Sequence, residues 1–192
     1  MIRAFRLLAF LLCCTAFACM PGCSGDPRPA PSAGPSRPAE GDPDAIAEAG
    51  RALMTGENGR PRDPDRARDL FELAAQKGSG AGLFYLGLLS YEGRERGPDR
   101  KQACALFALS AARGHPGGLR EYGECQLQGA GGVAKDSRAA ADSFRASIAN
   151  GGVEAYESLA RLYGSGEGVP RDPQEQARLL QKREALREGR QE

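Results

Sequence analysis

Three glycines, Gly164, Gly166 and Gly168, lie within five residues of the stretch 159–177, LARLYGSGEGVPRDPQEQA. A glycine-rich loop can present backbone N–H groups to a phosphate, which would indicate a nucleotide binder or an enzyme. A phosphate loop, however, follows a strand, whereas these glycines follow an apolar run with helical spacing. Gly166 also has a counterpart in each of three earlier segments, at Gly56, Gly93 and Gly129. We therefore interpret these four glycines as structural turns.

The other reactive residue types form no catalytic or metal-binding pattern. The one histidine, His115, lies in a Gly-His-Pro-Gly turn with no signature nucleophile beside it, so we interpret it as a turn residue. No pair of histidines or cysteines has the spacing of zinc ligands. The carboxylates fall where helix caps and solvated helix faces are expected, so no acid/base pair stands out. We expect no catalytic residue, no metal and no cofactor.

The charge balance argues against a nucleic-acid partner. Lysine and arginine number 26 and aspartate and glutamate 25, and two of the arginines, Arg3 and Arg6, belong to an N-terminal leader. Without them the chain has no basic excess to neutralise phosphates.

The leader has the order of a secretory signal. Arg3 and Arg6 precede an uncharged apolar run at residues 7–18, which small residues and cysteines follow. A signal peptide has an apolar segment of about 7 to 15 residues, whereas a membrane-spanning helix needs about 20. We predict a signal peptide at residues 1–22.

This leader resembles that of bacterial lipoproteins, in which a small residue precedes the cysteine that is acylated. Cys23 follows Gly22 and is the favoured acceptor, and Cys19, which follows Ala18, is the alternative. Each acyl chain contributes about 0.8 kcal/mol per buried methylene, so several chains hold a soluble domain at a bilayer. The resemblance implies a bacterial cell-envelope protein attached to the membrane by its lipid anchor only. Ser24 implies the outer membrane, facing the periplasm.

Residues 23–44 are predicted to form a disordered tether. The stretch 24–44 holds six of the thirteen prolines and no large apolar residue. It cannot bury enough apolar surface to offset the cost of ordering, so it stays extended. A proline-rich ligand for a partner's groove is the alternative function.

From residue 45 onward the sequence repeats every 36 to 37 residues. A small residue stands six positions before each turn glycine, at Gly50, Gly87, Gly123 and Ala160. Further along, aspartate, alanine and phenylalanine follow at intervals of four, at Asp63, Ala67, Phe71; Asp99, Ala103, Phe107; and Asp136, Ala140, Phe144. This period is typical of stacked helix–turn–helix units. We predict an all-α solenoid over residues 45–192, with units at about 45–80, 81–116, 117–152 and 153–192.

Each unit is predicted to hold a helix A, a glycine turn and a helix B. The small residue inside helix A, for example Gly87, marks the point where helix B crosses too closely for a larger side chain. The turn glycine ends helix A with a positive φ. In the last unit, Asp172 and Pro173 begin helix B, and Glu175 is placed to complete a capping box.

One group of residues carries a family resemblance, namely Leu159, Ala160, Tyr163, Gly166, Gly168 and Val169. This pattern resembles the Sel-one-like repeat, a relative of the tetratricopeptide repeat, over residues 45–186. The resemblance implies a non-catalytic scaffold that binds an unidentified protein or peptide on the concave surface lined by the A helices. It implies these groove positions: Phe84, Leu88, Tyr91, Arg120, Glu124, Leu127, Glu157 and Arg161.

The sequence does not decide which way the side chains of the first three groove residues point. Phe84, Leu88 and Tyr91 would form an exposed apolar stripe if they face the groove. The alternative is that they pack against a neighbouring helix. Two other functions also stay open, a binder of cell-wall glycan or peptide fragments and an envelope hydrolase.

Two cysteines, Cys104 and Cys125, lie in the repeats on helices predicted to be neighbours. The oxidising envelope would let a disulfide persist, and some family members join their repeats in this way. The positions matching Cys125 are apolar, but those matching Cys104 are more often outward-facing. The sequence therefore leaves the pairing open.

Overall fold

The computed structural model describes residues 41–59, 61–93 and 97–189. These residues form α-helices and one short 3₁₀ turn, Glu57–Gly59, and no strand occurs among them. The helices are α1 (Pro43–Thr55), α2 (Pro64–Gln76), α3 (Gly80–Glu92), α4 (Arg100–Ala112), α5 (Pro116–Gln128), α6 (Ser137–Ala149), α7 (Ala155–Ser165) and α8 (Pro173–Glu188). The predicted signal peptide, Cys19, Cys23 and the tether as far as residue 40 lie outside the described residues.

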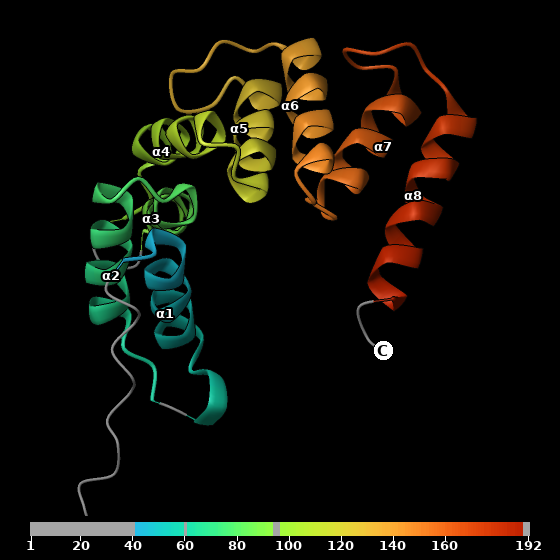
Figure 1. The fold of residues 1–192 in the computed structure, drawn as a ribbon. Coiled ribbons are helices and arrows are strands. Elements are labelled where there is room, and N and C mark those ends of the chain that lie inside the picture. Colours follow the sequence, from blue (N-terminus) through green and yellow to red (C-terminus); the bar gives the residue numbers. More distant parts are fainter. Residues whose placement is uncertain (1–40, 60, 94–96, 190–192) are drawn as a thin grey trace, which may run out of the picture. The chain divides into compact units, whose positions relative to one another are not determined.

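The helices pack in chain order as four hairpins (Figure 1). Within the hairpins, α1 packs on α2, α3 on α4, α5 on α6, and α7 on α8. Between hairpins, each helix B packs on the helix A that follows it, and α3 also contacts both α1 and α5. The predicted all-α solenoid of four helix–turn–helix repeats is confirmed.

The folded part begins two residues before the predicted boundary. α1 starts at Pro43, and the side chain of Asp42 accepts a hydrogen bond from the Asp44 N–H at 3.0 Å. Placing residues 43 and 44 in the tether was therefore wrong. Asp42 and Pro43 repeat the Asp-Pro start of α2 and α8, in which aspartate caps the helix and proline takes the first turn.

The small residue of each of the first three A helices lies under a phenylalanine. A Cβ built on Gly50, Gly87 or Gly123 would stand 2.6, 2.5 or 2.6 Å from the ring of Phe71, Phe107 or Phe144. These three rings are among the largest fully buried side chains. The predicted close crossing is confirmed there, because a methyl group would overlap a ring that close packing holds in place.

The four turn glycines end their A helices in the left-handed region, with φ of 75°, 62°, 66° and 77° at Gly56, Gly93, Gly129 and Gly166. Each donates its N–H to a carbonyl four residues earlier. Glycine suits this position because other residues pay about 1 to 2 kcal/mol for the same conformation.

Beyond these glycines, the turns of the last two hairpins lie against the preceding hairpin. A Cβ on Gly168 would overlap the Ser137 carbonyl, and one on Gly131 would stand 2.5 Å from the Arg100 carbonyl oxygen. Val169 is 8% exposed and belongs to the core around α6, α7 and α8. Each turn therefore covers the first turn of the preceding helix B.

The predicted capping box at Glu175 was wrong. Asp172 caps α8 by accepting from the N–H groups of Gln174 and Glu175, both at 3.0 Å. The Glu175 carboxylate instead binds the Arg178 guanidinium at 2.7 and 2.8 Å. The Asp172 N–H that it would have bound already donates to the Tyr163 carbonyl at 2.9 Å.

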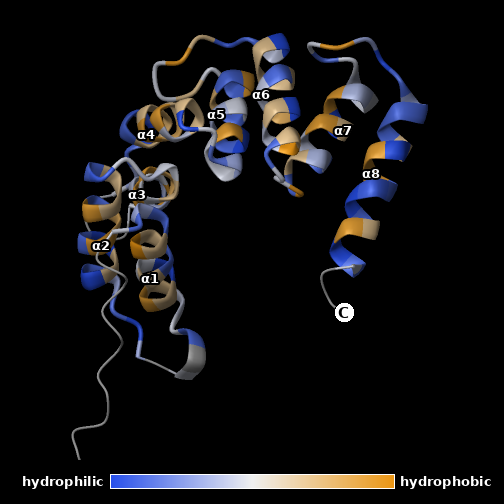
Figure 2. Cartoon of the chain, viewed as in Figure 1, coloured by the Kyte–Doolittle hydropathy of each residue, from blue (hydrophilic) through white to orange (hydrophobic). Residues whose placement is uncertain are grey.

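Most of α8 is hydrophilic, and Leu179 is its one buried residue among those described (Figure 2). None of the helices within the described part of the chain has the length and apolar character needed to cross a membrane.

Candidate functional site on the A helices

Of the predicted groove residues, Phe84, Leu88 and Leu127 are partly buried in the core. Phe84 and Leu88 pack against the cluster formed by Ala103, Phe107 and the two cysteines, and Leu127 packs against the cluster around Phe144 and Leu159. The Phe84 ring lies 4.9 Å from the His115 ring, between centroids. For Phe84 and Leu88 the packed alternative therefore describes the structure, and the predicted apolar stripe reduces to Tyr91.

Tyr91 is 49% exposed and stands at the C-terminal end of α3. The Arg100 guanidinium lies over its ring, 5.5 Å from the centroid. A cation at this distance is attracted to the negative face of the aromatic ring.

The charged groove residues link three helices through ion pairs. Glu124 on α5 accepts hydrogen bonds through Oε1 from Ser158 Oγ at 2.8 Å and from Arg161 Nη2 at 2.7 Å, both on α7. Glu157 on α7 pairs with Arg183 on α8. Exposed pairs contribute about 0 to 1 kcal/mol, so their main effect is to orient these side chains. We call the connected surface that carries Tyr91, Arg120, Glu124, Glu157 and Arg161 the A-helix face.

Tyr91 and Glu124 meet at a pocket of about 170 Å³ between α3, α4 and α5, which we call the Tyr91 pocket. Its lining residues are Tyr91, Arg100, Cys104, Phe107, Glu121, Glu124, Cys125, Gln128 and Ala130. The structure thus brings together two of the eight predicted groove residues here. Arg120, Glu157 and Arg161 do not line the pocket.

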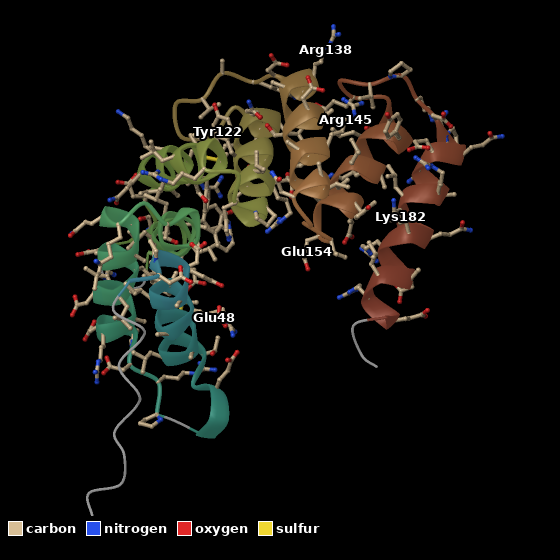
Figure 3. All side chains as sticks on the ribbon, viewed as in Figure 1. Glu48, Tyr122, Arg138, Arg145, Glu154 and Lys182 are labelled. Atoms are coloured by element: carbon tan, nitrogen blue, oxygen red, sulfur yellow. A yellow bond between two sulfur atoms is a disulfide. The ribbon has the colours of Figure 1, made fainter. Side chains whose placement is uncertain are left out.

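Cys104 and Cys125 form a disulfide in the pocket wall, with Cα atoms 6.0 Å apart. Figure 3 shows this yellow bond between α4 and α5. The two residues are 3% and 7% exposed, so the expected outward position of Cys104 was wrong. Gly131 explains the burial, because it belongs to a turn with one extra residue and a Cβ on it would stand 2.9 Å from Cys104 Sγ.

Glu121 is a pocket residue that the groove positions did not include. Burial, together with the charge of Glu124, raises the pKa of its carboxyl, and Arg120 opposes this by pairing with it. Glu121 lies three residues before Glu124, and residues at this spacing share a helix face. That spacing was the available signal. The sequence did not predict that Arg100, on helix α4, also lines this pocket.

His115 caps α5, which gives the predicted turn residue a definite structural role. Its Nδ1 accepts a hydrogen bond from the Gly118 N–H at 3.2 Å. Ser79 occupies the same place at the start of α3, where its Oγ accepts from the Gly82 N–H at 3.0 Å. Burial lowers the pKa of the His115 imidazole, because the charged form loses hydration.

A second, larger pocket of about 600 Å³ lies between α6 and the turn before α8. It is lined by Arg138, Asp142, Arg145, Gly166, Gly168, Val169 and Pro170. Figure 3 labels Arg138 and Arg145 on α6. Arg145 is already held by Asp142 at 2.7 Å and by the Tyr163 hydroxyl at 3.1 Å. Within the described residues, no group of three or more His, Cys, Asp or Glu side chains could hold a metal ion.

The stacked hairpins and the exposed A-helix face define an α-solenoid of the repeat-scaffold class. The Sel1 repeat model matches residues 43–79, 80–115, 116–142 and 153–182. These matches cover more than half of the chain, and the chain belongs to the Sel1 repeat family. Sel1 repeat proteins generally act as non-catalytic scaffolds that bind other proteins.

Two solved structures show the same fold. One, a protective antigen present in uropathogenic Escherichia coli strains and displaying an SLR fold, is 27% identical with a TM-score of 0.63. The match covers 77% of this chain and 31% of that one. The other, a Sel1 repeat protein from Oxalobacter formigenes, is 23% identical with a TM-score of 0.63 over 73% of this chain and 55% of that one. The chain thus spans about a third and about half of their lengths. No curated protein matches it.

Proposed function

We propose that the chain is a lipid-anchored scaffold of the bacterial cell envelope that binds a protein or peptide through its A-helix face and catalyses no reaction. The observation that carries the proposal is Tyr91, a half-exposed aromatic residue beside an open pocket on this face. Interface energy is concentrated in a few residues, and tyrosine and arginine are enriched among them. Tyr91 is the candidate anchor, and Glu124, Glu157 and Arg161 are the candidate rim.

The proposed lipid anchor and envelope location are supported by the leader sequence and by the disulfide. Acylation at Cys23, or at Cys19, would hold the repeats at the outer membrane on its periplasmic side. The Cys104–Cys125 bond supports an oxidising compartment, because thiols are kept reduced in the cytosol. Changing both candidate acceptors, Cys19 and Cys23, to alanine should release the chain from membranes. A double variant that stays membrane-bound and acylated would contradict the lipid anchor at these cysteines.

The binding proposal is tested by crosslinking in whole envelopes with Tyr91→Ala and Arg120→Ala variants. Leu109→Ala is the matched control, because Leu109 is 52% exposed on a B helix, α4. We expect a captured partner to be lost or reduced roughly tenfold with Tyr91→Ala, the loss typical of an interface hot spot. Capture should be unchanged with Leu109→Ala. A partner indifferent to Tyr91→Ala and Arg120→Ala would contradict the assignment of this face.

A second candidate partner is a cell-wall glycan or peptide fragment. The Tyr91 pocket favours it by combining an aromatic ring with polar groups such as Glu121 and Gln128. Purified cell-wall fragments should then bind the isolated chain and compete with the protein partner for Tyr91. If cell-wall fragments do not bind at millimolar concentration, this candidate is excluded and a protein or peptide stays as the proposed partner.

A further inference from the structure

We propose that the Tyr91 pocket binds a single basic side chain, lysine or arginine, presented by the partner. This inference rests on the proposed function, since it names the chemistry of the partner at the same face. The partner is therefore a protein or peptide with an exposed cationic residue at its contact point.

The size of the pocket limits the occupant to one side chain. Sites for whole small molecules occupy roughly 300 to 1,000 Å³. The Tyr91 pocket is smaller, at about 170 Å³, and it opens on the A-helix face beside a half-exposed tyrosine. A single extended side chain from a docked partner fits this volume better than a free metabolite does.

Two carboxylates supply the charge that a basic side chain needs. Glu121 and Glu124 both line the pocket, and their side chains are 21% and 19% exposed. Arg120 binds Glu121 through Oε1, and Ser158 and Arg161 both bind Glu124 through Oε1. Among the described residues, no hydrogen bond is made to Oε2 of either carboxylate. Each therefore keeps one oxygen able to accept a bond from an ammonium or a guanidinium.

The two carboxylates also repel each other. Burial raises the pKa of the Glu121 carboxyl, the charge of Arg120 lowers it, and the charge of Glu124 adds a smaller rise. Arg120 and Arg161 do not line the pocket, so their charges neutralise the carboxylates from outside it. A cation inside the pocket would gain charge-assisted hydrogen bonds with the two half-buried carboxylates.

The aromatic ring provides a second and independent indication of a cation. The Arg100 guanidinium already lies 5.5 Å from the Tyr91 centroid, so this ring face holds a positive charge within the chain itself. Arg100 is exposed. An incoming basic side chain would displace it from the ring, so Arg100 acts as a weak internal competitor.

The effect of removing Arg100 distinguishes a cation-binding pocket from an anion-binding one. If the pocket bound an anionic group, Arg100 would be its holding residue, and removing it would abolish binding. If the pocket binds a cation, removing Arg100 strengthens binding, because both competition and repulsion are lost.

The experiment uses the mature, acylated, disulfide-intact chain in a neutral maltoside detergent and follows its backbone amides by NMR. The probes are n-butylammonium, which reproduces the end of a lysine, n-butanol as the uncharged control and butyrate as the anionic control. We expect only n-butylammonium to shift the amides of Glu121, Glu124 and Gln128 saturably. Glu124→Gln should weaken this binding roughly three- to tenfold, Glu124→Asp should restore part of it, and Arg100→Gln should strengthen it roughly twofold or more.

Equal shifts from n-butanol, preference for butyrate, or weaker n-butylammonium binding in Arg100→Gln would overturn the proposal. Unchanged amide dispersion in Glu124→Gln shows that the variant is folded. Failure of this inference can be distinguished from failure of the proposed function. Partner capture that depends on Tyr91 without any cation preference would leave the proposed function standing and refute this inference. Capture that is indifferent to Tyr91 would refute the proposed function.

Discussion

The junction between the second and third hairpins differs from the junction between the third and fourth in how it is fastened. At the first, the Cys104–Cys125 disulfide joins α4 to α5, and His115 caps α5 with its side chain. At the second, no disulfide occurs between the described helices, and the residue before α7, Glu154, makes no side-chain cap bond. The turn residues Gly168 and Val169 pack across this junction, as Gly131 does across the first, but with no disulfide beside them.

The same kind of repeat junction can therefore be held by a packed turn together with a disulfide, or by a packed turn without one. The Tyr91 pocket lies at the covalent junction, so its walls on α4 and α5 are fixed relative to each other. Preorganised walls reduce the ordering cost of binding. The other junction contributes the Glu124–Arg161 ion pair of the A-helix face.

The largest expected effect comes from removing the covalent fastening. Replacing both Cys104 and Cys125 with alanine should lower the free energy of unfolding by about 3 kcal/mol, because the disulfide restricts the unfolded chain. Thermal unfolding measures the change. A reductant should lower the Tm of the wild type and leave that of the double variant unchanged. Equal Tm values for the two proteins without reductant would contradict the difference between the junctions.

The packed junction is broken by Gly168→Ala, which should destabilise the chain by about 2 kcal/mol through backbone strain and overlap with the Ser137 carbonyl. Gly151→Ala is the matched control, since Gly151 also has a positive φ, 86°, but nothing lies within 4 Å of its Cβ position. This control should cost only about 1 kcal/mol. Equal losses in chemical denaturation would show that the turn does not fasten the junction.

The His115 cap makes the covalent junction sensitive to pH. Burial lowers the pKa of the imidazole in the folded chain, and only the neutral ring accepts the Gly118 N–H. The cap is therefore fully present above the unfolded pKa of about 6.5. Its stabilisation is lost as the pH falls through the lower, folded pKa.

His115→Ser, which copies the Ser79 cap, should remove this component from a stability profile measured between pH 5 and 8. Its free energy of unfolding at pH 8 should stay within about 1 kcal/mol of the wild type. Identical profiles for the two proteins would contradict the role of the ring as an acceptor.

The smallest effect is expected at the Glu124–Arg161 ion pair, which joins the third hairpin to the fourth. Arg161 is 56% exposed, so Arg161→Ala should cost less than about 1 kcal/mol of stability, and added salt should reduce the difference. Denaturation at low and high ionic strength measures it. A loss of several kcal/mol would show that Arg161 is a structural residue rather than part of a rim.

The repeat period and its glycines predicted the fold because each signal is local. Gly87 is needed because it lies under the Phe107 ring, and Gly129 because it has a positive φ, and both requirements arise within one hairpin. The exposure of the predicted groove side chains, in contrast, depends on contacts with neighbouring hairpins. Phe84 packs inward because Gly117 leaves room for it, and a Cβ there would stand 2.8 Å from the ring.

Cys104 is buried for a similar reason that sequence matching between repeats could not reveal. The extra residue in the turn 129–133 brings Gly131 onto it, so a residue at an outward-facing position becomes part of the core. The Tyr91 pocket likewise combines residues of three helices from two hairpins. Such a combination follows from stacking and not from any one repeat.

Site-specific photo-crosslinking in living cells tests whether the A-helix face around Tyr91 binds a partner. A photoreactive residue is placed at Tyr91 and, in separate strains, at Leu73 and Leu109 on the B helices α2 and α4, which are also exposed. We predict a discrete crosslinked protein from the Tyr91 position and none from the other two. Crosslinks from Leu73 or Leu109 alone, with none from Tyr91, would contradict binding through this face.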